Sequence, residues 1–217
     1  EVRKMKRCLD ALDEIVTVSE HSKYSMIQTF PFLMERNIRV YYGQSITSVS
    51  GCCLKLDCLN VPNDSFVLLL GGDRWIKNVY RSIVALDKLF DKGFLESKKV
   101  VVLGKTNRKI VHRIKNRNRS MFLDYVDSGT LEQLYLSCSL FLYPSLNEGF
   151  GFPPLEAIKY GKTCVVSGVC SLNEIFGKAV YYVNPYDIPE IATRVLYALE
   201  HPINRKIIMS QYEEIVK

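Results

Sequence analysis

The 217-residue sequence lacks any hydrophobic run long enough to span a bilayer. Its longest apolar runs, such as Phe66–Leu70 and Val100–Leu103, fall far short of the roughly 20 residues that a membrane helix requires. No N-terminal stretch has the pattern of a signal peptide. Glycine and proline are too sparse, at 12 and 8 residues, for a collagen-like or low-complexity chain. These absences favour a globular protein, which we expect to be cytoplasmic.

Patterns that bind metals are also scarce. The seven cysteines are an odd number, and most lie in apolar contexts typical of reduced, buried thiols. The group Cys52, Cys53 and Cys58 matches no common zinc spacing, and no histidine lies nearby to complete a tetrahedral set. The sequence also contains no Asp-x-Asp pair. We therefore predict no metal site and no cofactor.

Acidic residues are missing from one segment, residues 105–119, which holds seven basic residues. The whole chain has a formal charge of +6, and without this segment the remainder carries about one negative charge. Basicity is thus local. Such a stretch could meet an anionic surface, but the favoured interpretation is the solvated outer face of one helix, with Ile110, Val111 and Ile114 turned inward. No nucleic-acid partner is expected.

Short β-branched runs alternate with helical periodicity along the chain. The predicted strands are residues 15–18, 38–42, 66–70, 99–103, 121–126, 140–143, 163–166 and 179–183. The predicted helices are residues 21–35, 78–91, 105–119, 131–137 (capped by Ser128 or Thr130), one from Pro153 to Gly161, 189–200 and 203–215. Buried strands separated by helices predict an α/β fold with a Rossmann-like, doubly wound parallel sheet, whose ligands bind beyond the carboxyl ends of the strands.

Two loops at that edge carry the chemistry. After Tyr143, Gly149 and Gly151 lie at the start of a helix opened by Pro153-Pro154. Such a helix start offers backbone amides to an anion. Glu148 and Glu156 bracket these glycines, and carboxylates beside a phosphate are useful as acceptors for sugar hydroxyls. After Leu70, Arg74 and Lys77 suit a diphosphate, although a surface ion pair with Asp73 or a neighbouring residue is the simpler alternative for them. A nucleotide sugar fits both loops.

The segment Pro144–Ser167 resembles the EGFG-x-P-x-x-E-A signature of retaining GT-B glycosyltransferases of the family 4 type. Other segments resemble that family in the same order, over about residues 14–200. They are Val16–Lys23, Arg39–Gly43, Asp124–Val126 with Leu131, Leu134 and Tyr135, Ser171–Ile175 with Gly177 and Ala179, and Asn184–Asp187. The resemblance implies the C-terminal half of a GT-B enzyme. It differs from the family in that Arg74 and Lys77 stand three positions apart, closer than the usual four or five.

The resemblance also implies roles for individual residues. Arg74 and Lys77 would hold the donor diphosphate and stabilise the leaving group, and Glu148 would contact the donor sugar near its reacting face. Glu156 would accept the ribose hydroxyls. The base would be met mostly through the backbone of Tyr125 or Val126. The other donor-binding residues are Gly72, Ser145, Gly149, Phe150, Gly151, Phe152 and Leu155, of which residues 149–151 would supply amides.

The implied reaction transfers a sugar from a nucleoside diphosphate, UDP or GDP, to an acceptor glycan or lipid-linked sugar with retention, in polysaccharide biosynthesis. Residues 1–43 would be the tail of an N-terminal acceptor domain, 44–64 a linker, 65–200 the donor domain and 201–217 a helix crossing back toward the N-terminal domain. Without the rest of that domain we expect little or no transfer. The alternatives are a nucleotide-sugar binding module without transferase activity, and a module that binds a polyanion or a membrane through residues 105–119. A peripheral contact with the inner face of a membrane also stays open within the transferase interpretation.

Overall fold

The computed structural model describes residues 2–43, 65–107, 111–112 and 114–217. The predicted linker 44–64, including the cysteines at 52, 53 and 58, lies outside the described residues. So does the middle of the basic stretch, at residues 108–110 and 113. In the described part of residues 105–119 the predicted continuous helix is wrong: only residues 111–112 are α-helical, residues 105–107 and 114–116 are irregular or turn, and Arg117–Arg119 is the 3₁₀ helix η4.

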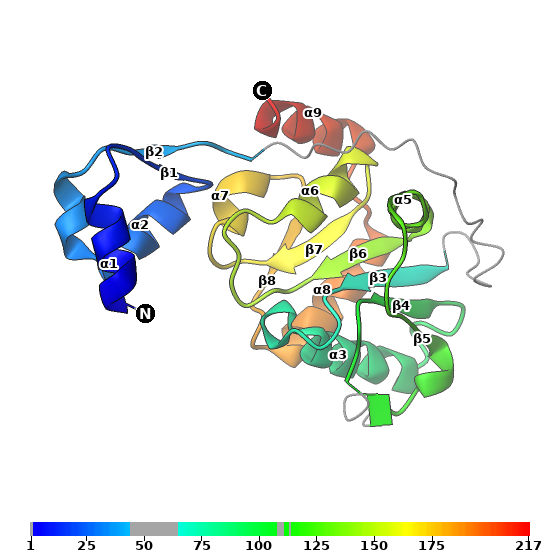
Figure 1. Cartoon of the computed structure of the whole chain (residues 1–217). Helices are drawn as coiled ribbons and strands as arrows, with labels where there is room; N and C mark the ends of the chain where they lie inside the picture. The colour runs from blue at the N-terminus through cyan, green and yellow to red at the C-terminus, as the bar shows by residue number, and fades with distance from the viewer. Residues whose placement is uncertain (1, 44–64, 108–110, 113) are drawn as a thin grey trace.

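Six parallel strands form the main sheet (Figure 1). They are β3 (Phe66–Leu70), β4 (Lys99–Leu103), β5 (Ser120–Leu123), β6 (Leu140–Tyr143), β7 (Cys164–Ser167) and β8 (Tyr181–Val183). The central strands are valine- and leucine-rich and almost wholly buried, as a sheet covered on both faces requires. Their order is β5-β4-β3-β6-β7-β8.

The strand order reverses between β3 and β6, which pair directly although β4 and β5 lie between them in the chain. The chain runs outward from β3 to β5, then returns to the other side of β3 and continues to β8. This is the topological switch point of a doubly wound sheet, and the loops that follow β3 and β6 separate there to leave a crevice. The predicted fold class is confirmed.

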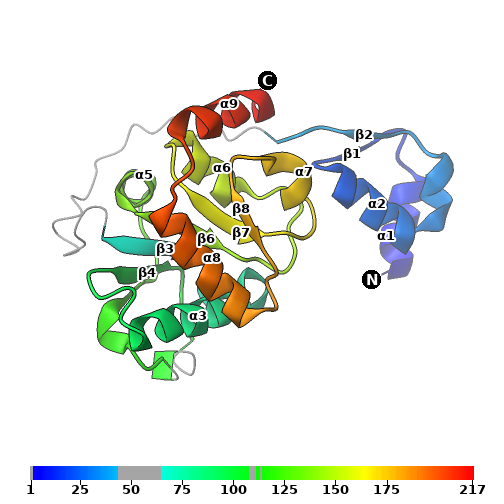
Figure 2. The same cartoon turned by 180° about the vertical axis from the view of Figure 1, so that it is seen from behind.

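Helices cover both faces of this sheet (Figures 1 and 2). Alternate side chains of each strand enter two separate cores, because successive residues of a strand point to opposite faces. One core packs against α3 (Val79–Asp91) and α8 (Ile188–Glu200). The other packs against α5 (Ser128–Ser137), α6 (Phe152–Lys159), α7 (Leu172–Phe176) and α9 (Arg205–Ile215).

The N-terminal residues form a small unit beside α7 (Figures 1 and 2). Its elements are α1 (Val2–Asp10), β1 (Ile15–Thr17), α2 (Glu20–Thr29), the 3₁₀ helix η1 (Pro31–Glu35) and β2 (Ile38–Val40). The two strands pair in parallel, and Ile15, Phe30, Leu33 and Ile38 form its core.

Several predicted boundaries are wrong for local reasons. The helix predicted over 21–35 ends at Thr29, because Pro31 disfavours helical backbone at the preceding residue and Phe30 is extended, with φ −132°. The cap of α5 is Asp127, whose carboxylate accepts from the Thr130 N–H, so neither predicted residue serves as the cap. The strand predicted over 121–126 ends at Leu123. Helices α1 and α7 were not predicted at all.

The C-terminal helix α9 packs on α6 and α7, with Ile208 wholly buried. Its predicted crossing toward an N-terminal domain, like the four domain boundaries, stays a prediction. Within the described ranges, no helix combines the length and the apolar character needed to cross a membrane.

Candidate functional site

The loops after β3 and β6 are bonded to each other at the switch point. The Ile76 carbonyl accepts two hydrogen bonds, from the Leu146 N–H at 2.7 Å and from Ser145 Oγ at 2.9 Å. Asn78 Nδ2 donates to the Pro144 carbonyl at 3.0 Å and to the Pro185 carbonyl at 2.7 Å. Ser145 is wholly buried and its side chain holds the two loops together, so it does not itself line the cleft.

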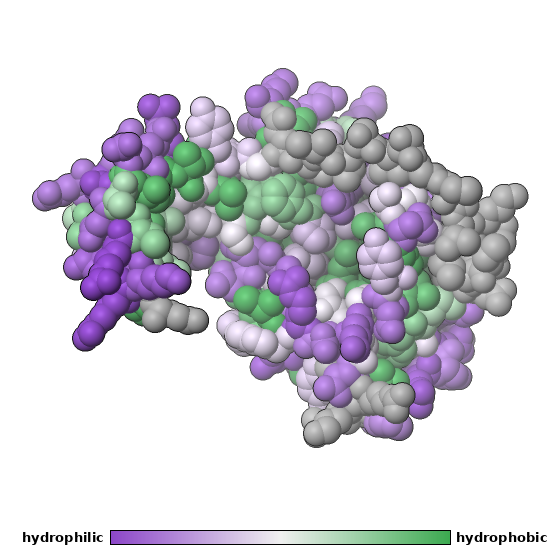
Figure 3. All heavy atoms as spheres, in the orientation of Figure 1, coloured by the Kyte–Doolittle hydropathy of each residue, from purple (hydrophilic) through white to green (hydrophobic). Residues whose placement is uncertain are grey.

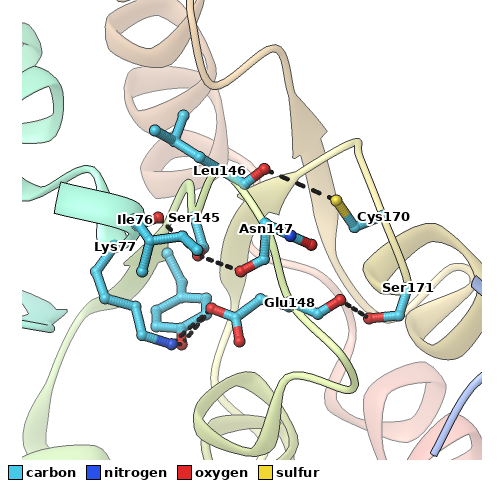
Figure 4. A network of polar contacts seen from close by, with 9 residues as sticks. Ile76, Lys77, Ser145, Leu146, Asn147, Glu148, Cys170 and Ser171 are labelled. Carbon is cyan, nitrogen blue, oxygen red and sulfur yellow. Dashed lines mark hydrogen bonds and ion pairs between the residues drawn. The ribbon is translucent and has the colours of Figure 1, made fainter. Parts of the chain in front are cut away.

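Lys77, Tyr143 and Glu148 meet between these loops (Figure 4). Lys77 Nζ lies 2.6 Å from Glu148 Oε1 and also donates to Tyr143 Oη. Tyr143 Oη donates to the same Glu148 oxygen at 2.8 Å. The Lys77 and Glu148 side chains are only 11% and 12% exposed, so salt screens this pair less than a surface ion pair, and removing one partner would leave the other charge buried. We name Lys77, Tyr143 and Glu148 the switch-point triad.

A cleft of about 380 Å³ opens over the triad. Figure 3 shows the molecule hollowed between the N-terminal unit and the sheet. The cleft is lined by α2 on one side and by the two loops on the other: His21, Ser22, Ser25, Arg74, Ile76, Lys77, Asn147, Glu148 and Gly149. Arg74, Lys77 and Glu148, predicted from distant segments, therefore share one site.

Arg74 is exposed at the cleft wall. Burial and the neighbouring Glu148 carboxylate raise the pKa of the Tyr143 phenol, and the positive charge of Arg74 opposes that rise. Among the described residues Arg74 makes no ion pair with Asp73, contrary to the simpler interpretation of this loop. Arg74 and Lys77 line the same cleft, so both cations can act on one bound anion.

The glycines of the second loop differ in their surroundings. Gly151 caps α6 with φ +98°, and a Cβ there would lie 2.4 Å from Leu172 Cδ2. Gly149 is exposed at the cleft. Phe150 is 2% exposed and Leu155 is wholly buried, so both belong to the core, and neither lines the cleft. Phe152 is exposed, with its ring 5.0 Å from that of Phe150.

Glu156 lies in α6 against the buried Tyr135, whose phenol donates to Glu156 Oε2 at 2.9 Å. Burial raises the pKa of this carboxyl, and the hydrogen bond from Tyr135 and the charge of Lys159 only partly oppose it. Glu156 is not among the residues that line the cleft, and its half-buried carboxylate lies on α6, which begins three residues after the cleft-lining Gly149.

The remaining predicted donor residues lie toward β4 and β5. Gly72 is buried, with φ +55°, and a Cβ there would lie 2.3 Å from the Lys105 carbonyl, so the loops after β3 and β4 pack closely. Tyr125 is 88% exposed beyond the end of β5, whereas Val126 packs against the core. The structure places these residues on the flank of the switch point, apart from the triad.

The sequence analysis missed four residues that build the site. Tyr143 was taken only as part of a buried strand, although its position at the carboxyl end of β6 was a usable signal. Asn78 joins the loops, and Ser171 Oγ donates to the Glu148 carbonyl at 2.9 Å. Glu174 of α7 accepts the backbone N–H groups of Glu20 and His21 at 2.7 and 3.0 Å, which fastens α2 beside the cleft.

Trp75 is 77% exposed, and His21 lines the cleft. In the covered part of the basic stretch Ile114 is buried as predicted, and the Asp87 carboxylate accepts the N–H groups of Lys115 and Asn116, each at 3.1 Å. Among the residues that the structure describes, no group of three or more His, Cys, Asp or Glu side chains lies close enough together to hold a metal ion.

Solved structures with this fold include a sucrose-phosphate synthase from Thermosynechococcus elongatus. It has a TM-score of 0.79 and 18% identity, over 99% of this chain and 56% of that one. The Anabaena protein HepE, solved in complex with UDP and glucose, has a TM-score of 0.73 and 20% identity, over 94% of this chain and 58% of that one. At these identities the likeness shows the GT-B fold alone.

Similar sequences include O-antigen chain mannosyltransferase B of Escherichia coli, 26% identical over 94% of this chain and 56% of that protein. O-antigen chain mannosyltransferase RfbU of Salmonella typhimurium is 27% identical over 84% of this chain and 49% of that protein. The chain thus spans about half the length of these curated relatives. The family model described as "Glycosyl transferases group 1" matches residues 59–214, which is most of the chain. The chain belongs to the group 1 glycosyltransferase family, as the sequence motifs predicted.

Proposed function

We propose that this chain carries the donor site of a retaining glycosyltransferase of the family 4 type. The protein would transfer a sugar from a nucleoside diphosphate, UDP or GDP, to an acceptor hydroxyl. The observation that carries the proposal is the convergence of Arg74, Lys77 and Glu148 on one cleft at the switch point. Cations and a carboxylate on one cleft suit a ligand that presents phosphates beside sugar hydroxyls.

The chemistry of the leaving group supports this assignment. Sugar transfer develops positive charge on the sugar and negative charge on the departing diphosphate. Lys77 and Arg74 line the cleft where that negative charge would collect, and the exposed backbone of Gly149 would add its amide. Lysine and arginine neutralising a diphosphate make a metal ion unnecessary, so we propose metal-independent transfer.

The carboxylates are proposed to recognise hydroxyls. A carboxylate near a diphosphate is repelled by it and is useful only as an acceptor. Glu148, on the cleft wall, would accept from the donor sugar, and Glu156, on α6, from the ribose. The base would lie along the backbone of Tyr125 and Val126, beyond β5. Doubly wound sheets bind nucleotides in this direction, from the switch point along the carboxyl ends of the strands.

The acceptor side is proposed from α2 and from the relatives. His21, Ser22 and Ser25 form the cleft wall opposite the cations, where an acceptor hydroxyl would enter. Two relatives are named O-antigen chain mannosyltransferases, which favours a glycan or lipid-linked sugar as acceptor and polysaccharide assembly as the setting. Such acceptors would bring the protein to the inner face of a membrane. We infer that residues 1–43 belong to an acceptor domain and residues 65–200 to the donor domain.

Ligand-observed NMR with UDP, GDP, ADP and their sugars tests the proposal. We expect selective binding of one nucleotide by the wild type, and a loss of at least tenfold in affinity for Glu156→Ala. Glu213→Ala, which removes an exposed carboxylate from α9, is the matched control and should bind like the wild type. A folded wild-type protein that binds none of these nucleotides would refute the donor-site assignment.

A further inference from the structure

The hydrogen bonds of the switch-point triad can be assigned in only one direction. Burial and the Glu148 charge raise the pKa of the Tyr143 phenol, so the phenol is protonated at neutral pH. Its O–H therefore donates to Glu148 Oε1, and its oxygen accepts from the Lys77 ammonium. Lys77 has three N–H donors and uses one for Tyr143 and one for Glu148.

In this assignment the two oxygens of the Glu148 carboxylate differ in the hydrogen bonds that they accept. Oε1 accepts from both Lys77 and Tyr143. Oε2 accepts no hydrogen bond from any residue that the structure describes, and Figure 4 shows the carboxylate with one oxygen turned away from Lys77. Glu148 lines the cleft, so Oε2 is the oxygen left to accept from a ligand. One N–H of Lys77 is likewise left for an anion.

Tyr143 is the rigid member of the triad. It is the last residue of β6, is 1% exposed and stacks on Phe141 with ring centroids 5.6 Å apart. Lys77 ends the short 3₁₀ helix η3 (Trp75–Lys77), Glu148 lies on a loop, and both have long side chains with several rotatable bonds. A phenol held by a strand and a packed core fixes where the other two groups meet, because residues on strands are positioned more precisely than residues on loops.

We propose that Tyr143 is a positioning residue that directs Glu148 Oε2 toward a hydroxyl of the donor sugar. The inference rests on the proposed function. It assigns Tyr143 to recognition of the sugar through Glu148. Lys77 also donates to the Tyr143 hydroxyl, but its ion pair with Glu148 does not depend on that hydroxyl, so its contact with the diphosphate should persist when the hydroxyl is removed. If the Tyr143 hydroxyl only satisfied its own hydrogen-bonding needs in the core, its removal would not weaken binding of the sugar selectively.

The test compares two ligands that differ only in the sugar. The ligand pair is UDP and UDP-glucose, or GDP and GDP-mannose, whichever pair the wild type binds. Calorimetry then gives the Kd of each ligand of that pair for the wild type and for Tyr143→Phe. We expect the nucleotide sugar to bind about tenfold more weakly to the variant, with the nucleoside diphosphate within twofold of wild type. Tyr182→Phe is the matched control, because it removes a tyrosine hydroxyl that donates to the Leu172 carbonyl in the same half of the protein.

A double-mutant cycle with Glu148→Gln shows whether Tyr143 acts through Glu148. If it does, adding Tyr143→Phe to Glu148→Gln weakens nucleotide-sugar binding by less than twofold, because coupled residues are non-additive. Three results would overturn the inference: equal losses for both ligands, full additivity in the cycle, or a Tyr143→Phe protein that no longer folds. A wild type that binds neither nucleoside diphosphate nor nucleotide sugar would instead refute the proposed function, and the inference with it.

Discussion

Replacing Gly151 with alanine should destabilise the protein far more than the same change two residues earlier. Gly151 caps α6 with φ +98° and ψ 53°, a backbone conformation that L side chains rarely adopt. A Cβ built there would lie 2.4 Å from Leu172 Cδ2 and 3.2 Å from Phe176 Cε2. Both neighbours are wholly buried in the core, so neither can move aside without disturbing α7.

The magnitude follows from two separate costs. Left-handed backbone at a residue with a Cβ costs about 1–2 kcal/mol. Forcing one extra carbon into a packed core typically costs about 1–3 kcal/mol. The free energy of unfolding should therefore fall by about 2–5 kcal/mol, which is a large part of the total stability of an ordinary domain.

Gly149→Ala is the matched control in the same loop. A Cβ at Gly149 would lie 3.5 Å from Ser22 Oγ and 3.5 Å from Val18 Cγ2, both at ordinary van der Waals distances. Its unfolding free energy should stay within about 0.5 kcal/mol of wild type. Urea denaturation followed by far-ultraviolet circular dichroism measures both variants. Equal stability of the two variants, or a loss below about 1 kcal/mol for Gly151→Ala, would refute this account of the loop.

Three further predictions concern buried or interacting polar groups. Burial raises the pKa of Glu156 above its ordinary 4.5, so this group favours folding below pH 4.5 and loses that contribution as pH rises through its folded value. Glu156→Gln should gain stability relative to wild type between pH 4 and pH 7 in urea denaturation, and a constant difference would contradict the shift. Within the described ranges Ser167 Oγ is buried without a hydrogen-bond partner, so Ser167→Ala should raise the unfolding free energy by about 1 kcal/mol. A lower unfolding free energy for the variant would show that the hydroxyl has a hydrogen-bond partner in solution. Glu174→Gln replaces a carboxylate that accepts two backbone N–H groups, and hydrogen bonds to charged groups contribute about 1.5–3 kcal/mol. The amides of Glu20 and His21 should then exchange with solvent at least tenfold faster, whereas unchanged exchange would mean that this contact does not hold α2 in place.

Much of the fold could be predicted from local patterns. The runs Phe66–Leu70 and Val100–Leu103 have the length and composition of strands buried on both faces, and the segments between them have helical periodicity. Right-handed crossover rules then leave few arrangements. Errors arose where one residue overrides a pattern, as Pro31 does at the end of α2, or where an element is too short to show a period, as α7 is.

The candidate site was only partly accessible from sequence. Arg74, Lys77 and Glu148 were found because their residue types suit a nucleotide sugar and the motif around Gly149 and Gly151 is specific. Tyr143 was missed because a tyrosine at the end of an apolar strand has the same local pattern as a core residue. That the Tyr143 hydroxyl meets Lys77 depends on a neighbour 66 residues away in the chain, and no local pattern records it.

The sequence by itself determined the parallel α/β architecture, the family and the two loops that carry charge, because periodicity, glycine placement and residue chemistry are properties of short segments. Only the tertiary structure decided that β3 and β6 are neighbours, and therefore that Lys77 meets Glu148. It also decided that Glu174 holds α2 against the cleft. Pairings between distant segments depend on how all the buried surfaces pack at once, and that packing is a property of the whole chain.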